Sequence, residues 1–176
     1  MVPGIGNSGP GHWQTLWQQR HLHWRRVVQR DWAHPHREAW VEALEAAMAD
    51  YSTPPVIIGH SIGCLVIAHW AGRSARKVRG TFLVAVPDPH APAFPPTAKG
   101  FDPLSLRRIP FPSLVVASHD DAFGSLEHAR RCADAWGSQF VEIGHAGHIN
   151  ADSGHGPWPE GWSLFERFVT ETAGRR

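Results

Sequence analysis

The sequence predicts an α/β protein in which a mostly parallel sheet is flanked by helices. Strand-like and helix-like segments alternate from end to end of the 176 residues. Within Val56–Trp70, a Gly-x-Ser-x-Gly turn joins an apolar strand to an apolar helix. Each cluster of polar residues that could take part in catalysis or binding follows a predicted strand. In such sheets, ligand sites lie beyond the carboxyl ends of the strands. The length and the lack of a linker predict a single domain over residues 1–176.

The first fifty residues predict two short strands and two helices. Met1–Gly11 has the composition of a strand end followed by a Gly-rich loop, so the first strand is expected to be short. His12–Arg20 predicts a helix, and Trp24–Arg30, with two valines at its centre, predicts a second strand. Arg37–Asp50 is the clearest helix, because its apolar residues recur at helical spacing and its glutamates lie off that face.

The central segment predicts a nucleophile elbow at Ser61. A β-branched apolar run after Pro54-Pro55 indicates a buried strand, and a helix is expected to begin near Ile62. Gly59 and Gly63 leave room where a Cβ would collide with neighbouring backbone. This turn would expose the Ser61 hydroxyl and direct the free amides of the helix N-terminus at the same point. The structural alternative is a tight turn in which Ser61 only caps the helix.

The remaining elements continue the alternation up to a closing helix. They are predicted as a strand at Thr81–Val86, a strand at Pro112–Ser118, a helix at Leu126–Trp136, a strand at Gln139–Ile143 and a helix at Glu160–Thr170. Six prolines from Pro87 to Pro103 exclude a regular helix or central strand there. Phe94 and Phe101 of this Pro-rich loop either line an acyl pocket or pack over the end of the sheet.

Two downstream loops contain the partners that a serine nucleophile requires. A serine needs a neutral imidazole as base and a carboxylate that orients the imidazole. His148 is the predicted base, on a Gly-rich loop after the last strand. Asp121 is the predicted acid, on the loop after the preceding strand, and the adjacent Asp120 is its competitor. His60 is expected to pack beside the elbow.

Composition argues against several other classes of function. The net charge is +1, from 17 basic and 16 acidic residues, so no nucleic-acid partner is predicted. No apolar run is long enough to cross a membrane, and Gly and Pro occupy the N-terminus where a secretory leader would be apolar, so a cytoplasmic protein is expected. Two cysteines predict no disulfide framework, and Cys64 is expected in the core.

No cofactor or metal is predicted. The 13 histidines form no His-Glu-x-x-His motif, and no cysteine pair accompanies them. The loop Gly4–Gly9 could cradle an anion through its backbone amides. It lacks the lysine of a phosphate-binding loop, so a phosphate site is the weaker interpretation.

Taken together, the motifs resemble the small serine hydrolase family that includes retinoblastoma-binding protein 9 and the bacterial YdeN-type proteins. The likeness rests on Gly59–Gly63, Ser118–Phe123 and Gly147–Asn150. Further matches to the bacterial branch extend it over essentially the whole chain, at Val2–Gly9 with His12-Trp13, at Asp31-Trp32 and at Ser153–Gly161.

The resemblance implies a compact, three-layered α/β-hydrolase fold without a separate cap domain or cofactor. It also implies a triad of Ser61, Asp121 and His148. The family has a proline after the acid, where this chain has Ala122. The implied oxyanion hole consists of the backbone N–H of Ile62 and that of Ile5 or Gly6.

The leading hypothesis is therefore an esterase-type serine hydrolase that acts on a small acyl substrate, whether ester, thioester or amide. One alternative is a catalytically weak binding module that contacts a protein partner through a Trp-rich surface. Another is acyl transfer to an acceptor other than water, which would use the same triad.

Overall fold

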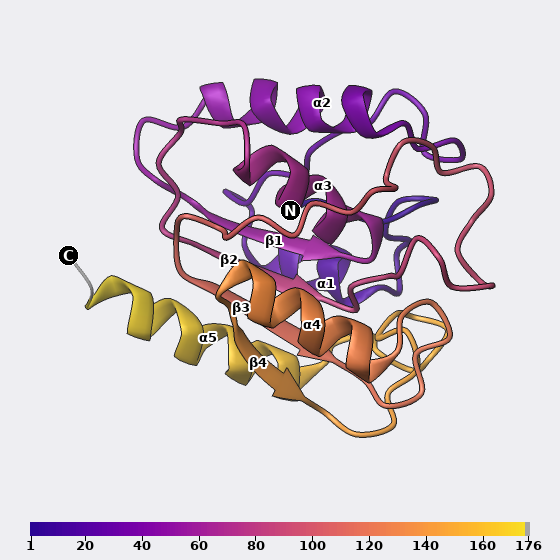
Figure 1. The fold of residues 1–176 in the computed structure, drawn as a ribbon. Coiled ribbons are helices and arrows are strands. Elements are labelled where there is room, and N and C mark those ends of the chain that lie inside the picture. Colours follow the sequence, from indigo (N-terminus) through magenta and orange to yellow (C-terminus); the bar gives the residue numbers. More distant parts are fainter. Residues whose placement is uncertain (175–176) are drawn as a thin grey trace.

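A four-stranded parallel sheet forms the centre of the computed structural model, which describes residues 1–174 (Figure 1). Its strands are adjacent in chain order and are β1 (Val56–His60), β2 (Gly80–Val84), β3 (Ser113–Ala117) and β4 (Gln139–Glu142). β1, β2 and β3 are buried almost throughout, as expected for strands covered on both faces. The predicted parallel α/β architecture is thereby confirmed.

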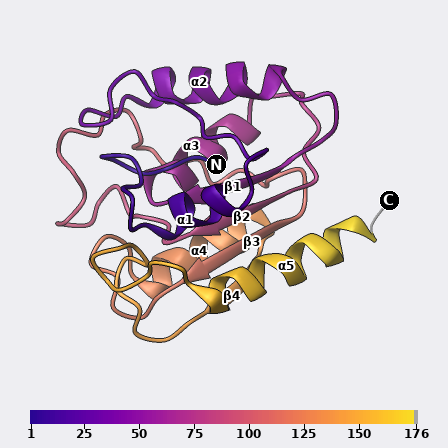
Figure 2. The same cartoon turned by 180° about the vertical axis from the view of Figure 1, so that it is seen from behind.

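Five helices cover the two faces of the sheet, as Figures 1 and 2 show from opposite sides. They are α1 (Trp13–Arg20), α2 (Arg37–Ala49), α3 (Ile62–Ala71), α4 (Leu126–Trp136) and α5 (Pro159–Ala173). Residues of α2, α3 and α4 pack into one core cluster, and residues of α1 and α5 pack into the other. The three layers follow from this division, because each face of the sheet buries its own set of apolar side chains.

The N-terminal segment runs beside β1 but forms only one bridge. Val2 pairs in parallel with Gly59, donating its N–H to Ile58 O at 2.7 Å and accepting from His60 N at 3.1 Å. The Gly-rich loop that follows is thereby brought to the carboxyl end of β1. The expected first strand is thus present as a single bridge.

The predicted strand at Trp24–Arg30 is wrong. This segment has no strand assignment, although Val27 N donates to Met1 O at 2.8 Å and the amino group of Met1 donates to Arg25 O at 2.6 Å. The neighbouring segment at Met1 is too short to build a ladder, and the side chain of Val28 remains 73% exposed. Val27 is buried in the core, so this one valine packs into the interior without a ladder of strand hydrogen bonds.

Most tryptophans lie in the interior rather than on the surface. Six of the nine are buried, namely Trp13, Trp17, Trp40, Trp70, Trp136 and Trp158. The other three, Trp24, Trp32 and Trp162, are half-buried. The described residues therefore lack the exposed Trp-rich surface that the binding-module alternative assumed. A protein partner remains an untested prediction.

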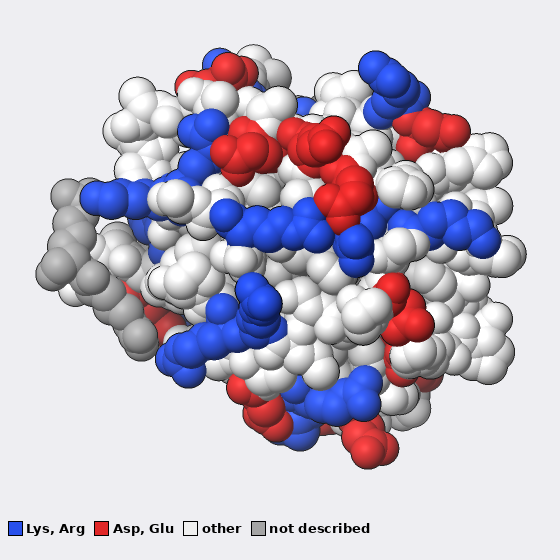
Figure 3. Space-filling model, turned by 45° about the horizontal axis from the view of Figure 1, so that its top comes forward, with Lys and Arg blue, Asp and Glu red and all other residues white. Residues whose placement is uncertain are grey.

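The surface carries interspersed charges of both signs. Figure 3 shows basic and acidic side chains next to one another on the face of the molecule that α2 covers. Arg73 pairs with Glu38 at 2.5 Å and Arg76 pairs with Glu45 at 2.5 Å, so part of the positive charge is neutralised locally. No helix in the part of the chain that the structure describes is long and apolar enough to span a membrane.

Candidate active site

Ser61 occupies a sharp turn between β1 and α3. Its backbone has φ 54° and ψ −129°, a region that side-chain-bearing residues rarely adopt. The strained turn is held because Ser61 N donates to Val84 O on the adjacent strand at 3.0 Å. At Gly63 a Cβ would lie 2.1 Å from Val2 O, so only glycine fits where the N-terminal segment crosses the elbow.

His148 bridges Ser61 and Asp121. Its Nε2 lies 2.8 Å from Ser61 Oγ, and its Nδ1 lies 2.9 and 2.8 Å from the two carboxylate oxygens of Asp121. A carboxylate only accepts, so the Nδ1 carries the proton and the Nε2 is left as an acceptor for the serine hydroxyl. The Asp121 side chain is 2% exposed, and its Oδ1 also accepts from Phe123 N at 2.9 Å. The structure thus brings together all three residues that the sequence nominated.

Asp120 has a different place from Asp121. Its Oδ1 accepts from Ser118 Oγ at 2.7 Å and from Gly147 N at 2.8 Å. These hydrogen bonds lower the pKa of the Asp120 carboxyl below its ordinary value. Asp120 therefore holds the backbone of the loop that carries His148, whereas Asp121 faces the imidazole.

Two backbone amides near Ser61 are available to an anion. Ile62 is the first residue of α3, so its N–H has no acceptor within that helix. The N–H of Ile5 makes no backbone hydrogen bond within residues 1–174, whereas Gly6 N donates to Trp32 O at 2.8 Å. Of the two amides that the sequence left open, Ile5 is therefore the free one. A Cβ on Gly4 would lie 2.9 Å from the Ser61 Cβ, so this loop passes directly over the serine.

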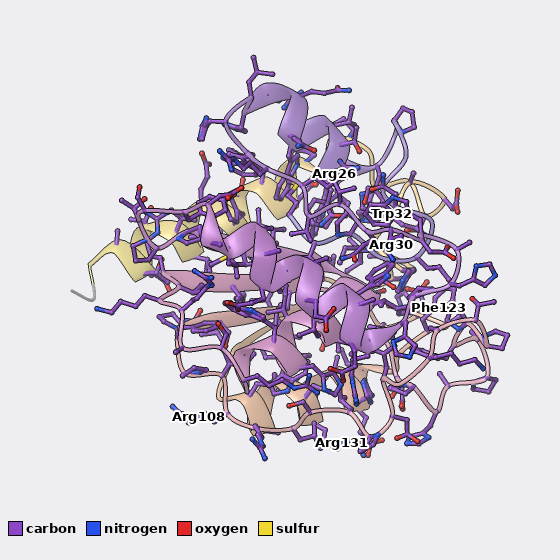
Figure 4. All side chains as sticks on the ribbon, turned by 90° about the horizontal axis from the view of Figure 1, so that it is seen from above. Arg26, Arg30, Trp32, Arg108, Phe123 and Arg131 are labelled. Atoms are coloured by element: carbon purple, nitrogen blue, oxygen red, sulfur yellow. The ribbon has the colours of Figure 1, made fainter. Side chains whose placement is uncertain are left out.

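A cavity of about 370 Å³ opens onto Ser61 and His148. Its apolar walls include Ile62, Phe123 and two prolines of the Pro-rich loop, Pro87 and Pro95. Phe123 lies at the end of the molecule where the strands terminate (Figure 4), and its ring centroid is 4.4 Å from that of His148. The polar lining includes Asn7, Asn150 and Asp152.

The two phenylalanines of the Pro-rich loop do not line this cavity. Phe101 is 1% exposed and belongs to the core, and Phe94 packs against the same core. Of the two interpretations that the sequence left open, packing over the sheet is the one that the structure supports.

Two further imidazoles lie beside the site and are neutral near pH 7. Burial lowers the pKa of His60 well below its ordinary value. Burial and the nearby Arg26 guanidinium lower the pKa of His12 to about 4. The ring centroids of His12 and His60 are 4.7 Å apart, and those of His60 and His148 are 5.0 Å apart.

Sequence reasoning missed several residues that support the His148 loop. His60 Nε2 lies 2.9 Å from His148 O, Trp13 Nε1 donates to Ile149 O at 2.9 Å, and Ser118 Oγ accepts from Ala146 N at 2.9 Å. All three contacts join residues far apart in the chain. The one available signal was position, since His60 and Ser118 stand at strand ends and Trp13 follows the Gly-rich loop.

No group of three or more His, Cys, Asp or Glu side chains is placed to hold a metal ion among the residues described.

Comparisons with known proteins show the family to which the chain belongs. A family model described as serine hydrolase matches residues 1–167. A crystal structure described as that of a YdeN-like hydrolase from Pectobacterium atrosepticum has 34% identity to this chain and a TM-score of 0.88, over 98% of this chain and 91% of that one. No protein with a curated description matches the chain.

Two more distant structures show the fold. The ydeN gene product of Bacillus subtilis has 19% identity and a TM-score of 0.77, over 96% of each chain. A thermophilic esterase from Thermogutta terrifontis has 19% identity and a TM-score of 0.67, over 96% of this chain and 88% of that one. These matches extend over nearly the full length of both partners.

Proposed function

Because the chain belongs to the serine hydrolase family, we propose that it hydrolyses small esters through an acyl-enzyme formed on Ser61. The observation that carries this proposal is the position of His148, with one ring nitrogen on Ser61 Oγ and the other on Asp121. This arrangement provides a base for the hydroxyl proton and a fixed negative charge for the imidazolium that results.

In the first half-reaction, Ser61 Oγ attacks the carbonyl carbon of the ester. His148 Nε2 takes the hydroxyl proton, and the carbonyl π electrons move to oxygen, giving a tetrahedral oxyanion. The C–O bond to the alcohol then breaks, and the imidazolium returns its proton to the departing alcohol. Asp121 remains ionised and holds the ring through Nδ1.

In the second half-reaction, water replaces the alcohol. His148 Nε2 removes a proton from the water as it attacks the acyl carbon, and the second tetrahedral intermediate collapses to release the acid. The proton returns to Ser61 Oγ, so the enzyme is regenerated. Since water attacks from the same cavity, its access from solvent is required for turnover.

The backbone N–H groups of Ile62 and Ile5 are the proposed donors to the oxyanion. Both amides flank Ser61, and neither is engaged by another backbone group. Each donor of this kind contributes roughly 3 kcal/mol to transition-state stabilisation in serine hydrolases. Because the donors are main-chain groups, the side chains at these positions are free to shape the cavity.

The size of the cavity favours a short acyl group. Its volume of about 370 Å³ is near the lower end of the usual range for ligand pockets, which is roughly 300–1,000 Å³. Ile62, Pro87 and Phe123 offer an apolar surface for a few methylene groups. We therefore propose small carboxylic esters as the substrate class, with thioesters accessible to the same chemistry.

The test is hydrolysis of p-nitrophenyl butyrate by the wild type and four variants. Ser61→Ala and His148→Ala should each lose roughly four to six powers of ten in turnover, because removing either one abolishes nucleophilic attack. Asp121→Asn should lose roughly four powers of ten, because the amide favours the wrong tautomer. Asp120→Asn should lose far less, since Asp120 hydrogen-bonds Ser118 Oγ and Gly147 N rather than the imidazole.

A fluorophosphonate probe separates a weak enzyme from an inert scaffold. The wild type should be labelled on Ser61, and Ser61→Ala should not. A folded wild type that shows neither turnover nor labelling would contradict the proposed function and favour a binding module.

A further inference from the structure

The backbone around His148 is held in an unusual conformation. Gly147 has φ 55°, and Ile149 has φ 48°. Positive φ is ordinary for glycine, but it is a strained conformation for a β-branched residue such as isoleucine. Such strain persists only where the surroundings over-determine the backbone.

Two buried side chains donate hydrogen bonds to the carbonyl groups on either side of this strained position. His60 Nε2 lies 2.9 Å from His148 O, and because a carbonyl only accepts, this nitrogen carries the proton of the neutral ring. Trp13 Nε1 donates to Ile149 O at 2.9 Å. His60 stands at the end of β1 and Trp13 begins α1, so the loop is tied to two separate elements.

We propose that Trp13 and His60 are positioning residues for the hydrolysis, which act by holding the His148 and Ile149 carbonyls so that His148 Nε2 stays within reach of Ser61 Oγ. The inference rests on the proposed role of His148 as the base. Neither side chain takes part in the proton transfers. If the loop relaxes, Ile149 can leave its strained conformation, and His148 shifts relative to Ser61.

The same helix contains a matched control. Trp17 lies one turn beyond Trp13, is also buried, and donates its Nε1 to Pro157 O at 2.9 Å. The two rings contact each other, with centroids 4.7 Å apart, so they share one aromatic cluster. Their acceptors differ, because Ile149 adjoins His148 whereas Pro157 lies eight residues further along the chain.

The decisive comparison is therefore Trp13→Phe against Trp17→Phe. Each change removes one N–H donor and leaves a similar gap, so both should lower the unfolding midpoint in urea. With p-nitrophenyl butyrate, Trp13→Phe should lose about tenfold to a hundredfold in kcat with little change in KM, since a misplaced base slows chemistry rather than binding. Its rate of labelling by fluorophosphonate should fall in parallel. Trp17→Phe should retain kcat within about threefold.

His60 supplies a second pair of variants if Trp13→Phe does not fold. Glutamine at this position keeps an N–H donor for His148 O, and methionine has a similar length without one. His60→Gln should retain most of kcat, whereas His60→Met should lose about tenfold or more at similar KM.

The outcomes distinguish this inference from the proposed function. The positioning role is wrong, and the hydrolase remains, if Ser61→Ala abolishes activity but the members of each pair lose kcat equally. The two pairs are Trp13→Phe with Trp17→Phe, and His60→Gln with His60→Met. If the folded wild type has no activity and no labelling, the proposed function fails and this inference fails with it.

Discussion

At the scale of single residues, His12 shows how burial determines protonation. Its Nδ1 accepts from Gln14 N at 3.1 Å and so caps the first turn of α1. The side chain is 6% exposed, and its Nε2 has no hydrogen-bond partner. Burial and the Arg26 charge therefore make the protonated form unfavourable in the folded protein, with a pKa of about 4.

The lowered pKa of His12 predicts a loss of stability in mild acid. Well above pH 6.5 the ring is neutral in both states. As the pH falls from about 6.5 towards 4, the unfolded chain binds a proton that the folded protein does not, so the free energy of unfolding decreases. The His12 share of this loss is about 3 kcal/mol near pH 4, from the difference between the two pKa values.

His12→Asn should remove this share of the pH dependence. Asparagine is a favoured helix N-cap, so the contact with Gln14 N can be kept while the imidazole is lost. Urea unfolding between pH 4 and 7 should give a shallower slope for His12→Asn than for the wild type. The control is His23→Asn, which replaces an exposed histidine. An unchanged slope in His12→Asn would show that the ring does not contribute.

The two adjacent aspartates show a limit of residue-level prediction. Asp120 and Asp121 follow the same strand, and the sequence alone left them as competitors for His148. In the structure, Asp121 places both carboxylate oxygens on His148 Nδ1, and Asp120 binds Gly147 N. The choice depends on which way each side chain leaves the turn, and local sequence does not determine this direction.

At the scale of elements, the elbow is the junction on which the site depends. β1 ends at His60 and α3 begins at Ile62, so one residue makes the whole reversal of direction. Val2 O lies so close to Gly63 that the N-terminal segment and α3 are in backbone contact. The proposed oxyanion donors come from these two elements, Ile5 from the loop and Ile62 from the helix.

Gly63→Ala should therefore be severely destabilising. The added methyl would lie 2.1 Å from Val2 O, and no rotation relieves a contact between a Cβ and a backbone oxygen. We expect a loss of about 3 kcal/mol or more in the free energy of unfolding, or failure to fold. Urea unfolding monitored by tryptophan fluorescence measures it.

Gly11→Ala is the matched control for this prediction. A Cβ at Gly11 meets no atom within 4 Å, so its effect should stay within about 1 kcal/mol. Equal stabilities for the two variants would mean that the N-terminal segment moves freely away from the elbow.

At the scale of the whole molecule, the site is bounded by loops. Between β2 and β3 the described chain forms neither helix nor strand, and the Pro-rich loop in this stretch contributes Pro87 and Pro95 to the cavity. The cavity is correspondingly small and lies at the carboxyl end of the sheet. Long acyl chains would have to extend into solvent rather than into an enclosed tunnel.

This architecture predicts a preference for short acyl chains. The kcat/KM for p-nitrophenyl esters should be highest from acetate to hexanoate, and roughly tenfold or more lower for dodecanoate, because the added methylene groups gain no buried contact. The series is measured below the aggregation threshold of each ester, with Ser61→Ala as background. A steady rise in kcat/KM up to dodecanoate would contradict the small-cavity interpretation.

Local patterns in the sequence predicted most elements and the elbow at Ser61, but they left Asp120 and Asp121 as competitors for His148. Periodic apolar spacing predicted α2 to within one residue, and the predicted bounds of α4 match the structure. The glycines of the elbow predicted the turn, and the order of Ser61, Asp121 and His148 along the chain suggested the triad. The elements and the elbow are encoded within short segments of the chain, where spacing and backbone preference act directly.

Only the tertiary structure decided how distant segments meet. It showed that Trp24–Arg30 has no strand partner, that Trp32 occupies the amide of Gly6 and leaves that of Ile5 free, and that Trp13 and His60 hold the loop of His148. Each of these contacts joins residues separated by more than twenty positions. Their geometry follows from packing of the whole chain, because a hydrogen bond requires placement to within a few tenths of an ångström, and no local pattern specifies that placement.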